Sequence, residues 1–406
     1  MLSVSEARER VLNAVSPLEV IEAPLEDSRG LVLARDAVAP HPLPRFDNSA
    51  MDGYALAGED AAEASDHHPA ELRVVGEVRA GDPGELRVVS GTAARIMTGA
   101  PLPPGADAVA PIEVVEEAAG KILVRAPAPP GANVRPAGED VAEGDVVVQT
   151  GTELGAGEIA ILASLGLTPA PVHRRPRVAL LVTGDELVAV GHDPLPGQIR
   201  DSNSLALAAL CEEAGAEVAL MEHLPDDRDA TLAGFERAAR DCDVIVSSGG
   251  VSVGKYDYVK DVVQQLGGID LWRVAMQPGK PVVLGRVKDK PFLGLPGNPV
   301  SIHIGFEQFV RPALRKMRGL RALLRPTVRA RLEKPLRKSP GRLQFVRVRL
   351  AYRDEIFWAL PAKGQGSHMQ SSLVGCHGVA HFAADATHLE AGDEVEVEVW
   401  RLPEGQ

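Results

Sequence analysis

The centre of the chain carries a short apolar run, a glycine-rich segment and an amphipathic stretch in direct succession. The run Val244–Val246 consists of β-branched residues, as is typical of a strand buried on both faces. Ser247–Gly254 follows it and supplies glycines, which let a backbone approach an anion closely. Residues 257–266 then place valine and leucine on one side, as an amphipathic helix does. This pattern predicts a strand, a glycine-rich turn and a helix.

The same alternation continues on both sides of this unit, from Arg177 to Arg318. Further strands are predicted at Val178–Val182, Val218–Met221, Leu271–Met276, Val282–Leu284 and Phe292–Leu295. Helices are predicted to begin at Asp201–Asn203 and Asp226–Asp229, and a long final helix covers Val300–Arg318, which Pro312 should kink or divide. Strands that alternate with helices predict a doubly wound, mostly parallel sheet in a three-layer α/β domain.

The flanking regions have different patterns, which predict a multidomain α/β protein. Residues 1–48 and 134–176 are predicted as one mixed α+β domain, with helices at Ser3–Val15 and Gly155–Leu165 and a strand at Leu31–Val38. Residues 49–133 are predicted as an inserted β domain, with strands at Leu72–Val78, Leu86–Val89, Ala108–Val115 and Ile122–Val124. The α/β domain covers 177–322, and alternating β pattern predicts a small C-terminal β domain at 323–406.

Composition narrows the class of protein. The 406 residues are 45% apolar and 24% charged, as in globular proteins with a large core. The net charge of −13 argues against nonspecific binding to nucleic acid or to anionic membranes. The three cysteines lack the close spacing of a zinc site or a disulfide framework. Neither a leader nor a membrane-spanning apolar run is recognised, so the cytoplasm is the expected location.

Carboxylates recur in loops of site-like composition. They are Asp52, Asp140, Glu186, Asp201, Asp226 and Asp257. Helix capping, which contributes about 0.5–2 kcal/mol, is the ordinary explanation for any one of them. The last four, however, are predicted at strand ends or helix starts of the α/β domain, where ligands bind. Such a group can hold Mg²⁺ together with phosphate oxygens, and Lys280 and Arg273 are natural partners for oxyanions.

Other chemistries have little support in the sequence. His377 and His381 are four residues apart, but no HExxH pattern or nearby third ligand accompanies them, so ordinary structural histidines are expected. The chain has no CxxC or GxxxxGK[ST] motif. A dithiol redox enzyme and an ordinary nucleoside triphosphatase are therefore not indicated.

A set of short motifs gives the chain a resemblance to a known family. The motifs are SAMDGYA at Ser49–Ala55, TGAPLPPGADAV at Thr98–Val109, GED at Gly138–Asp140, TGDEL at Thr183–Leu187, SGGVSVG at Ser248–Gly254, PGKP at Pro278–Pro281, GLPGNP at Gly294–Pro299 and GQGS at Gly364–Ser367. In this order they resemble the bacterial MoeA group, the molybdopterin molybdenumtransferases, which are related to the eukaryotic gephyrin E domain. The resemblance extends over nearly the whole chain.

The resemblance implies an activity and an architecture. The family inserts molybdenum from molybdate into adenylated molybdopterin and releases AMP, with Mg²⁺ assisting. It implies an α/β domain of the molybdopterin-binding type, a C-terminal β-barrel and a homodimer whose sites lie between subunits. Transient contacts with the molybdopterin adenylyltransferase and with cofactor-accepting proteins are expected as well.

The resemblance also assigns roles to residues. Catalytic roles are implied for Asp52, Thr98, Asp140, Glu186, Asp257 and Lys280. Substrate binding is implied for Arg135, Asp226, Ser248, Gly249, Gly250, Ser252, Gly254, Arg273, Pro296, Gly297, Asn298, Pro299 and Ser367. Glu186, Asp226 and Asp257 are expected to hold Mg²⁺, and Asp52, Thr98, Arg135 and Asp140 are expected to reach the site from the second subunit.

Two alternatives and three departures from the family pattern accompany this interpretation. The α/β domain also resembles the adenylyltransferases and a family of nucleotide amidases, but neither is expected to carry SAMDGYA or TGAP. A noncatalytic molybdopterin-binding scaffold is the other alternative, and Asp52, Asp257 and Lys280 favour an enzyme. Gln277 and Arg273 stand where some relatives have lysine, and Gly375–His377 replaces an Ala-Asn-type stretch.

Overall fold

A computed structural model describes residues 1–82, 85–250 and 258–403. Contacts divide the chain into two compact units. The larger comprises Met1–Arg35, Gly151–Gly155 and Pro169–Gln406, and the smaller comprises Asp36–Thr150 and Ala156–Thr168. Each unit is described by itself, and the four-domain division made from the sequence stays a prediction.

A six-stranded sheet forms the centre of the larger unit. Its order is β17 (Glu217–Leu224), β14 (Arg177–Thr183), β18 (Val244–Ser248), β22 (Lys290–Leu295), β21 (Pro281–Val287) and β19 (Gly267–Arg273). The first four strands are parallel, and β21 and β19 add an antiparallel edge. The predicted mostly parallel sheet is confirmed. The predicted strand Leu271–Met276 is wrong, because β19 ends at Arg273 and β20 (Met276–Gln277) pairs with a strand of the C-terminal region.

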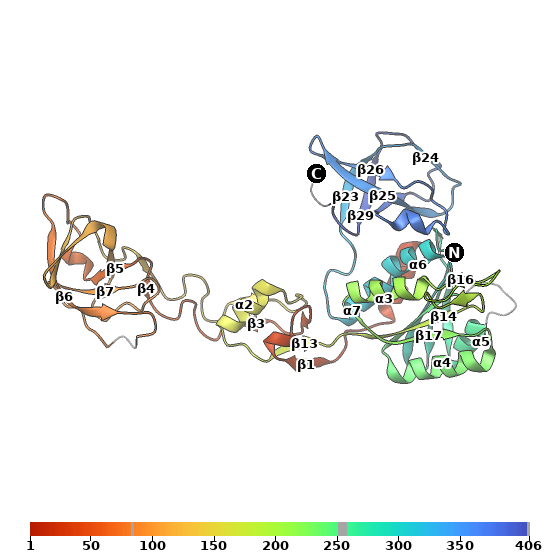
Figure 1. Ribbon diagram of the computed structural model, residues 1–406, viewed down its shortest axis with the longest axis horizontal. Helices are drawn as coiled ribbons and strands as arrows, with labels where there is room; N and C mark the ends of the chain where they lie inside the picture. The colour runs from red at the N-terminus through yellow and green to blue at the C-terminus, as the bar shows by residue number, and fades with distance from the viewer. Residues whose placement is uncertain (83–84, 251–257, 404–406) are drawn as a thin grey trace. The chain divides into compact units, whose positions relative to one another are not determined.

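Helices cover both faces of this sheet (Figure 1). One face carries α4 (Arg228–Asp241) and α5 (Tyr258–Leu266), and the other carries α1 (Val4–Asn13), α3 (Asn203–Glu213), α6 (Pro299–Gly305) and α7 (Arg311–Met317). Successive residues of β14 serve opposite cores: Val178 and Leu180 belong to the α3 side, and Ala179 and Leu181 to the α4 side. A strand that is buried on both faces needs a continuous apolar run, which explains why the sequence revealed it.

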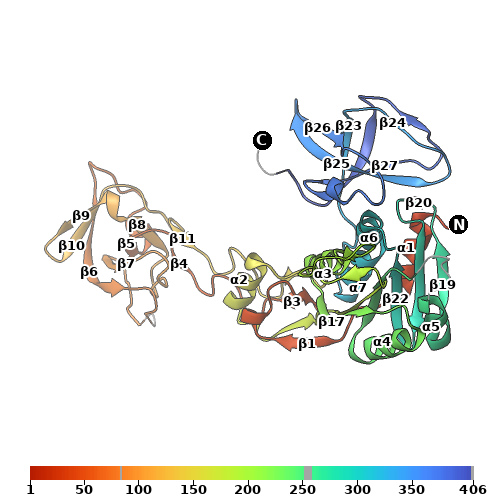
Figure 2. The same ribbon diagram turned by 45° about the vertical axis from the view of Figure 1, so that its right-hand side comes forward.

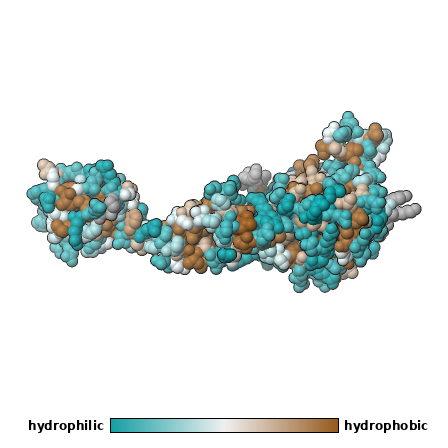
Figure 3. All heavy atoms as spheres, turned by 90° about the horizontal axis from the view of Figure 1, so that it is seen from below, coloured by the Kyte–Doolittle hydropathy of each residue, from teal (hydrophilic) through white to brown (hydrophobic). Residues whose placement is uncertain are grey.

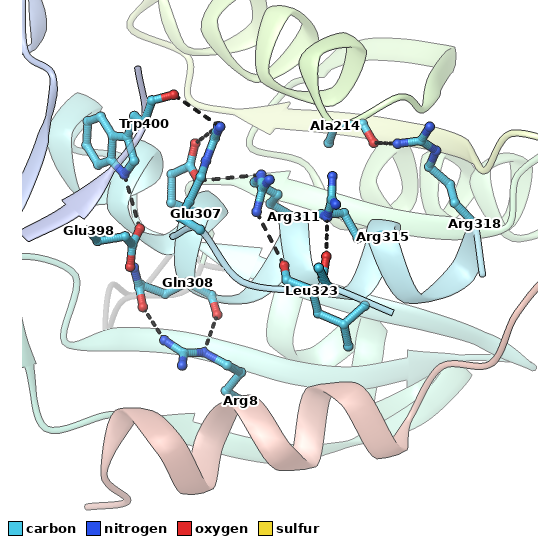
Figure 4. Close-up of polar contacts among 12 residues, drawn as sticks. Arg8, Ala214, Glu307, Gln308, Arg311, Arg315, Arg318, Leu323, Glu398 and Trp400 are labelled. Atoms are coloured by element: carbon cyan, nitrogen blue, oxygen red, sulfur yellow. Dashed lines mark hydrogen bonds and ion pairs between the residues drawn. The ribbon is translucent and has the colours of Figure 1, made fainter. Parts of the chain in front are cut away.

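The predicted long final helix is divided, as Pro312 suggested. A π-helical segment, Phe306–Val310, separates α6 from α7, and Pro312 lies in the first turn of α7, where its missing N–H costs least. Figure 4 shows that Gln308 of this segment contacts residues from both ends of the chain. Gln308 Nε2 donates to Glu398 at 2.8 Å, and its backbone carbonyl accepts from Arg8 at 3.3 Å. These contacts tie α1 and the C-terminal strands to the α/β core.

The C-terminal region is a closed β-barrel (Figure 2). Its strands are β25 (Leu343–Arg353), β26 (Ile356–Pro361), β23 (Thr327–Leu332), β29 (Glu394–Val399) and β27 (Gly378–Phe382), and β27 pairs back to β25. A short 3₁₀ turn at Gln370–Leu373 and the pair β24 (Leu336–Arg337) and β28 (His388–Leu389) accompany the barrel. Alternating residues Val346, Val348 and Leu350 fill its core, which confirms the predicted alternation and the barrel.

Shorter sheets complete the larger unit. One three-stranded sheet contains β1 (Val20–Ala23), β13 (Ala170–His173) and β2 (Val32–Leu33). A two-stranded pair contains β15 (Leu187–Val188) and β16 (Ile199–Arg200).

The smaller unit contains a second six-stranded sheet. Its order is β8 (Ala108–Pro111), β5 (Gly53–Leu56), β7 (Thr92–Ile96), β6 (Ala70–Val78), β10 (Lys121–Val124) and β9 (Val115–Ala118). Two short pairs and one helix accompany it: β11 (Val134–Arg135) with β4 (Asn48–Ser49), β12 (Val146–Val148) with β3 (Ala37–Val38), and α2 (Ala156–Ser164). The predicted β character of residues 49–133 is therefore present.

Three strand predictions in the first third of the chain were wrong in detail. Leu31–Val38 is split into β2 and β3, which pair with different partners. Leu86–Val89 joins no sheet ladder, because Val88 N–H donates to the Pro104 carbonyl and Val89 N–H to the Thr92 hydroxyl. Ala108–Val115 is interrupted after Pro111 by a 3₁₀ turn over Ile112–Val114. An apolar run thus reveals burial more reliably than it reveals pairing.

The surface is mostly polar. Figure 3 shows hydrophilic residues over most of the visible face, with hydrophobic residues in separate areas. Among the described residues, no helix combines the length and apolar character needed to cross a bilayer.

Candidate functional site

The glycine-rich turn lies where the parallel strands of the larger sheet end. Gly249 and Gly250 directly follow β18 and have positive φ values of 85° and 68°. A Cβ atom on Gly250 would lie 2.2 Å from Cγ2 of Val259, so this position excludes every larger residue. Ser252 and Gly254, the other predicted residues of this turn, lie outside the described residues. Gly249 and Gly250 therefore lie at the sheet edge where ligands of such folds bind.

A second loop, Pro296–Pro299, lies beside the glycine-rich turn. Gly249 N–H donates to the Leu295 carbonyl at 3.0 Å. Asn203 Nδ2 donates to the Ser248 hydroxyl at 3.2 Å and to the Gly297 carbonyl at 2.8 Å, so one side chain joins both loops. Asn203 was predicted only as part of a helix cap, and the local sequence did not reveal this bridge. Its position at a helix start on the sheet edge was the available signal.

Asp201 holds Asn203 in place by capping α3. Its Oδ1 accepts from the backbone N–H groups of Asn203 and Ser204 at 3.1 and 3.0 Å. The ordinary interpretation of Asp201 as a capping residue is confirmed, and its contribution to the edge is indirect.

The predicted residue Ser367 reaches the same region through its backbone. Asn298 occupies the N-cap of α6 and Pro299 its first turn, and Val300 N–H donates to the Ser367 carbonyl at 3.1 Å. Figure 1 shows α6 close to the C-terminal strands, in agreement with this contact. The GQGS loop thus meets the amino end of α6, directly after the Pro296–Pro299 loop.

Arg347, which was not predicted as a site residue, binds the backbone of the GQGS loop. Its Nε donates to the Ser372 hydroxyl at 2.7 Å, and its Nη2 to the carbonyls of Gly364 and Gly366 at 3.3 and 3.2 Å. The side chain is fully buried, and within the described residues its Nη1 has no hydrogen-bond partner. Burial lowers the pKa of Arg347 to about 10. Its place within an alternating strand pattern gave no signal of this role.

Three carboxylates gather at the ends of β14 and β17. Glu186 lies over Gly184, where a Cβ atom would come within 2.6 Å of its Oε2. Asp185 Oδ1 accepts from the Asp226 N–H at 3.0 Å. Burial raises the pKa of Asp226, and the neighbouring charges of Asp185 and Glu186 add to the effect. Asp227 rather than Asp226 caps α4, accepting from Ala230 N–H at 2.8 Å, so the Asp226 carboxylate is left for other ligands.

The described residues contain no cluster of three or more His, Cys, Asp or Glu side chains arranged to hold a metal ion by themselves. Asp257, the third predicted metal ligand, lies outside the described residues. Mg²⁺ usually takes only one or two carboxylates and fills its remaining positions with water and phosphate oxygens. Asp226 and its acidic neighbours therefore have the donor chemistry that Mg²⁺ requires.

The predicted cations lie at the antiparallel end of the same sheet edge. Arg273 is the last residue of β19 and is paired with Pro281, the first residue of β21. Lys280 directly precedes that strand, and its carbonyl accepts from Val274 N–H at 3.0 Å. Gly279 packs on α6, because a Cβ atom there would lie 3.4 Å from the Ser301 carbonyl. Across the part of the chain that the structure describes, neither cation forms an ion pair with a carboxylate.

The remaining predicted residues lie in the smaller unit. Asp52 Oδ1 accepts from both the N–H and the hydroxyl of Thr98, each at 2.7 Å. The backbone hydrogen bond, followed by the hydroxyl, lowers the pKa of Asp52. Asp52 and Thr98 thus form one fixed pair between the end of β4 and the loop after β7.

Arg135 and Asp140 also come together in the smaller unit. They line a cavity of about 500 Å³ with five other residues, which are Pro44, Phe46, Asn48, Gly99 and Glu139. Since Gly99 directly follows Thr98, this cavity adjoins the Asp52–Thr98 pair along the chain. The structure thus gathers the predicted residues into two clusters, one in each unit.

The two histidines of the C-terminal barrel have structural partners. His377 Nδ1 contacts the backbone N–H of Leu350 at 3.0 Å, and His381 Nδ1 lies 3.2 Å from Glu396 Oε1. The expectation that they are ordinary structural residues is confirmed.

Family models match three successive parts of the chain. They are the MoeA N-terminal region (domain I and II) at residues 2–166, a probable molybdopterin binding domain at 179–316 and the MoeA C-terminal region (domain IV) at 329–400. The chain is 40% identical to molybdopterin molybdenumtransferase 2 of Mycobacterium tuberculosis H37Rv, over 99% of its own length and 100% of that protein. It is 35% identical to the molybdopterin molybdenumtransferase of Haemophilus influenzae, with 98% of each chain covered.

A solved structure is similar over the same extent. The molybdopterin biosynthesis moeA protein of Pyrococcus horikoshii OT3 is 31% identical and has a TM-score of 0.85, with 98% of this chain and 100% of that chain covered. Both sequence relatives and the solved structure therefore match at least 98% of this chain.

Proposed function

Because this chain belongs to the MoeA family, we propose that it is a molybdopterin molybdenumtransferase that inserts molybdenum from molybdate into adenylated molybdopterin and releases AMP. It is a transferase of molybdenum cofactor biosynthesis, and residues 179–316 are its molybdopterin-binding domain. The finer proposals concern Mg²⁺, AMP release, the site residues and the dimer.

One observation carries the proposal: opposite charges flank two joined loops along a single sheet edge. Asp226 and Glu186 lie at the ends of β17 and β14, and Arg273 and Lys280 lie at the β19–β21 end. The glycine-rich turn and the Pro296–Pro299 loop lie on the strands between them, bridged by Asn203. A substrate with a phosphoanhydride and an oxyanion needs cations to offset its charge and a close backbone to hold its phosphates.

The residues of the edge suggest a division of roles. We assign phosphate contacts to Ser248–Gly250 and Pro296–Pro299, together with the amino end of α6. Arg273 and Lys280 would hold molybdate or the departing phosphate, since neither is engaged by a carboxylate in the described residues. Asp226 and Glu186 would hold Mg²⁺, which when bound neutralises charge on the phosphoanhydride. Burial, followed by repulsion from Asp185 and Glu186, raises the pKa of Asp226, and a bound cation would offset both effects.

The cluster of the smaller unit requires a separate proposal. We propose that the protein is a homodimer in which Asp52, Thr98, Arg135 and Asp140 of one copy complete the sheet-edge site of the other. A complementation experiment tests this directly: two strongly impaired variants, Asp52→Ala and Asp226→Asn, are mixed after dissociation and allowed to reassociate. Random pairing leaves one intact site in each mixed dimer, so about a quarter of wild-type activity should return. Mixtures that stay inactive would contradict a site built from two copies.

The decisive experiment for the activity is turnover. Purified protein is incubated with adenylated molybdopterin, molybdate and Mg²⁺, and AMP and protein-bound molybdenum are measured. AMP release that depends on molybdate supports the enzyme. Tight binding of the pterin without AMP release supports the noncatalytic scaffold instead. The adenylyltransferase, cofactor-accepting proteins and a cytoplasmic location remain predictions.

A further inference from the structure

The outer face of the C-terminal barrel carries two adjoining cavities that the proposed activity does not use. One, of about 590 Å³, is lined by residues of β25 together with Gly375, His377 and Arg401–Pro403. The other, of about 780 Å³, is lined by Lys334–Leu336, the end of β26 and residues 369–374. Arg349 and Leu360 line both cavities, so the two form one groove, which we call the barrel groove.

The barrel groove is basic in an acidic protein. Arg349, Arg353 and Arg401 line the first cavity, and Lys334, Arg349 and Lys363 line the second. Among the described residues, neither lining contains an aspartate or a glutamate, although the whole chain carries a net charge of −13. Within the described residues, only Arg353 of these five cations has a carboxylate partner, Glu333 at 3.3 Å. The groove therefore attracts anions.

Two of these cations are positioned by the backbone. Arg349 Nη2 donates to the Val374 carbonyl at 3.4 Å, and its guanidinium lies against Gly375, where a Cβ atom would come within 3.0 Å of Nη2. Arg401 Nε donates to the Cys376 carbonyl at 3.1 Å. A guanidinium has five N–H donors, so one bond fixes each side chain and leaves most of its donors for a ligand.

Exposed apolar side chains accompany the charges. Leu402 in the first cavity is 62% exposed and Val374 in the second is 72% exposed. A surface that combines cations with exposed apolar groups fits a polypeptide that carries both acidic and apolar side chains.

We propose that the barrel groove binds an extended acidic segment of a partner protein. A small oxyanion would need converging donors, whereas these five cations are divided between two cavities, and Arg349 alone among the five lines both. Single-stranded nucleic acid is disfavoured, because neither lining contains Phe, Tyr or Trp for base stacking. Strand addition is excluded as the binding mode, because β25 and β26 already pair on both sides within the closed barrel. The segment is therefore held by its side chains.

The test is direct binding, independent of catalysis. The probe is a short fluorescein-labelled peptide of glutamates interspersed with leucines, and fluorescence anisotropy measures its affinity for the full-length protein at low and high salt. The matched peptide with glutamine in place of glutamate is the ligand control. The acidic peptide should bind, weaken as salt rises, and bind at least about tenfold more tightly than the glutamine peptide.

Charge reversals locate the site. Lys334→Glu with Lys363→Glu should weaken binding by about tenfold or more, since attraction becomes repulsion. The control, Arg329→Glu with Arg331→Glu, makes the same change of net charge at exposed positions of β23 outside both linings and should leave the affinity within about twofold. Arg349→Gln keeps a polar side chain but removes the charge that both cavities share, and it should weaken binding of the acidic peptide.

Three results would overturn the proposal. The first is equal weakening by both double variants, which would mean that only net charge matters. The second is equal binding of the acidic and glutamine peptides. The third is tighter binding of a labelled single-stranded oligonucleotide, or of inorganic phosphate in competition, than of the acidic peptide. Unchanged circular dichroism and melting temperature of each variant show that loss of binding is not loss of fold.

Discussion

Two aspartates in two regions of this molecule show opposite electrostatic states. Asp226, at the sheet edge of the larger unit, has a raised pKa because it is partly buried and lies near Asp185 and Glu186. Asp52, in the smaller unit, has a lowered pKa because Thr98 donates two hydrogen bonds to one of its oxygens. Both were predicted as site residues from the same kind of evidence, a carboxylate in a loop with site-like neighbours.

The difference suggests two kinds of functional carboxylate. Asp226 is in surroundings that penalise its charge, so a bound cation would relieve the penalty. Asp52 already has its charge satisfied within the protein, so its contribution is to fix Thr98 and the loop that continues to Gly99. We therefore expect Asp226 to bind a ligand and Asp52 to position the Thr98 loop.

The largest effect should come from Asp226→Asn. Loss of this carboxylate should lower molybdate-dependent turnover by about 10²- to 10³-fold, because it weakens the binding of the Mg²⁺ that neutralises charge on the phosphoanhydride. The melting temperature should stay the same or rise, since repulsion with Asp185 and Glu186 disappears. AMP release and differential scanning fluorimetry measure the two effects. Asp229→Asn, an exposed position one turn away on α4, is the control and should change neither.

A fall in both activity and stability of Asp226→Asn would remove the distinction between the two aspartates. It would mean that Asp226, like Asp52, holds the fold together. Recovery of Asp226→Asn turnover at higher Mg²⁺ concentration would strengthen the distinction. It would show that the substitution impairs Mg²⁺ binding.

Asp52→Ala tests whether Asp52 positions the Thr98 loop. Thr98 loses the one oxygen that accepts both of its hydrogen bonds, so activity should fall by about 10- to 10²-fold and the melting temperature should fall as well. Asp60→Ala is the matched control: Asp60 accepts from the Ser90 hydroxyl and the Gly91 N–H at 2.8 Å each, outside the candidate site. Asp60→Ala should lower the melting temperature without lowering turnover by more than the stability loss explains. Equal losses of activity in the two variants would make Asp52 a purely structural residue.

The sequence revealed the elements whose pattern reflects burial. The runs at Val178–Val182 and Val244–Val246 are apolar because each strand lies between two helical layers, and both were predicted. Pro312 predicted the division of the last helix, because proline removes a backbone donor wherever it stands. The barrel strand at Val346–Leu350 was predicted from simple alternation.

Contacts between distant segments were beyond the sequence pattern. Asn203 joins two loops that follow different strands, and nothing in its local sequence specifies either partner. Arg347 stands among alternating barrel residues yet is buried, and its partners lie 17 to 25 residues away along the chain. The motifs located the loops, but only the fold shows which side chains hold them together.

Asn203→Ala tests whether substrate binding in the larger unit depends on the hydrogen bonds that join Ser248 to the Pro296–Pro299 loop, as well as on the charge of Asp226. Two hydrogen bonds disappear, each worth about 0.5–1.5 kcal/mol, so the KM for adenylated molybdopterin should rise by about tenfold with a smaller change in kcat. Steady-state kinetics separates the two constants. Asn203→Asp keeps the shape but turns a donor into an acceptor facing the Gly297 carbonyl, and should be at least as impaired. A normal KM in both variants would show that the loops hold their positions without the bridge.

The smallest expected effect, and the one that sets the two aspartates most directly against each other, is in the pH dependence of stability. The lowered pKa of Asp52 means that its contribution is present above the ordinary aspartate pKa of about 3.9 and is lost as pH falls through its folded pKa. The raised pKa of Asp226 means that its contribution is present below about 3.9 and is lost as pH rises through its folded pKa. The difference in melting temperature between wild type and Asp52→Asn should therefore grow with rising pH, while that between wild type and Asp226→Asn should shrink or change sign. Melting curves recorded without added Mg²⁺ measure both differences. Addition of Mg²⁺ at neutral pH should stabilise wild type more than Asp226→Asn, because the cation would offset the charge of the Asp226 carboxylate. Parallel pH profiles for the two variants would mean that both carboxylates are in equivalent surroundings and that neither is specially prepared for a cation.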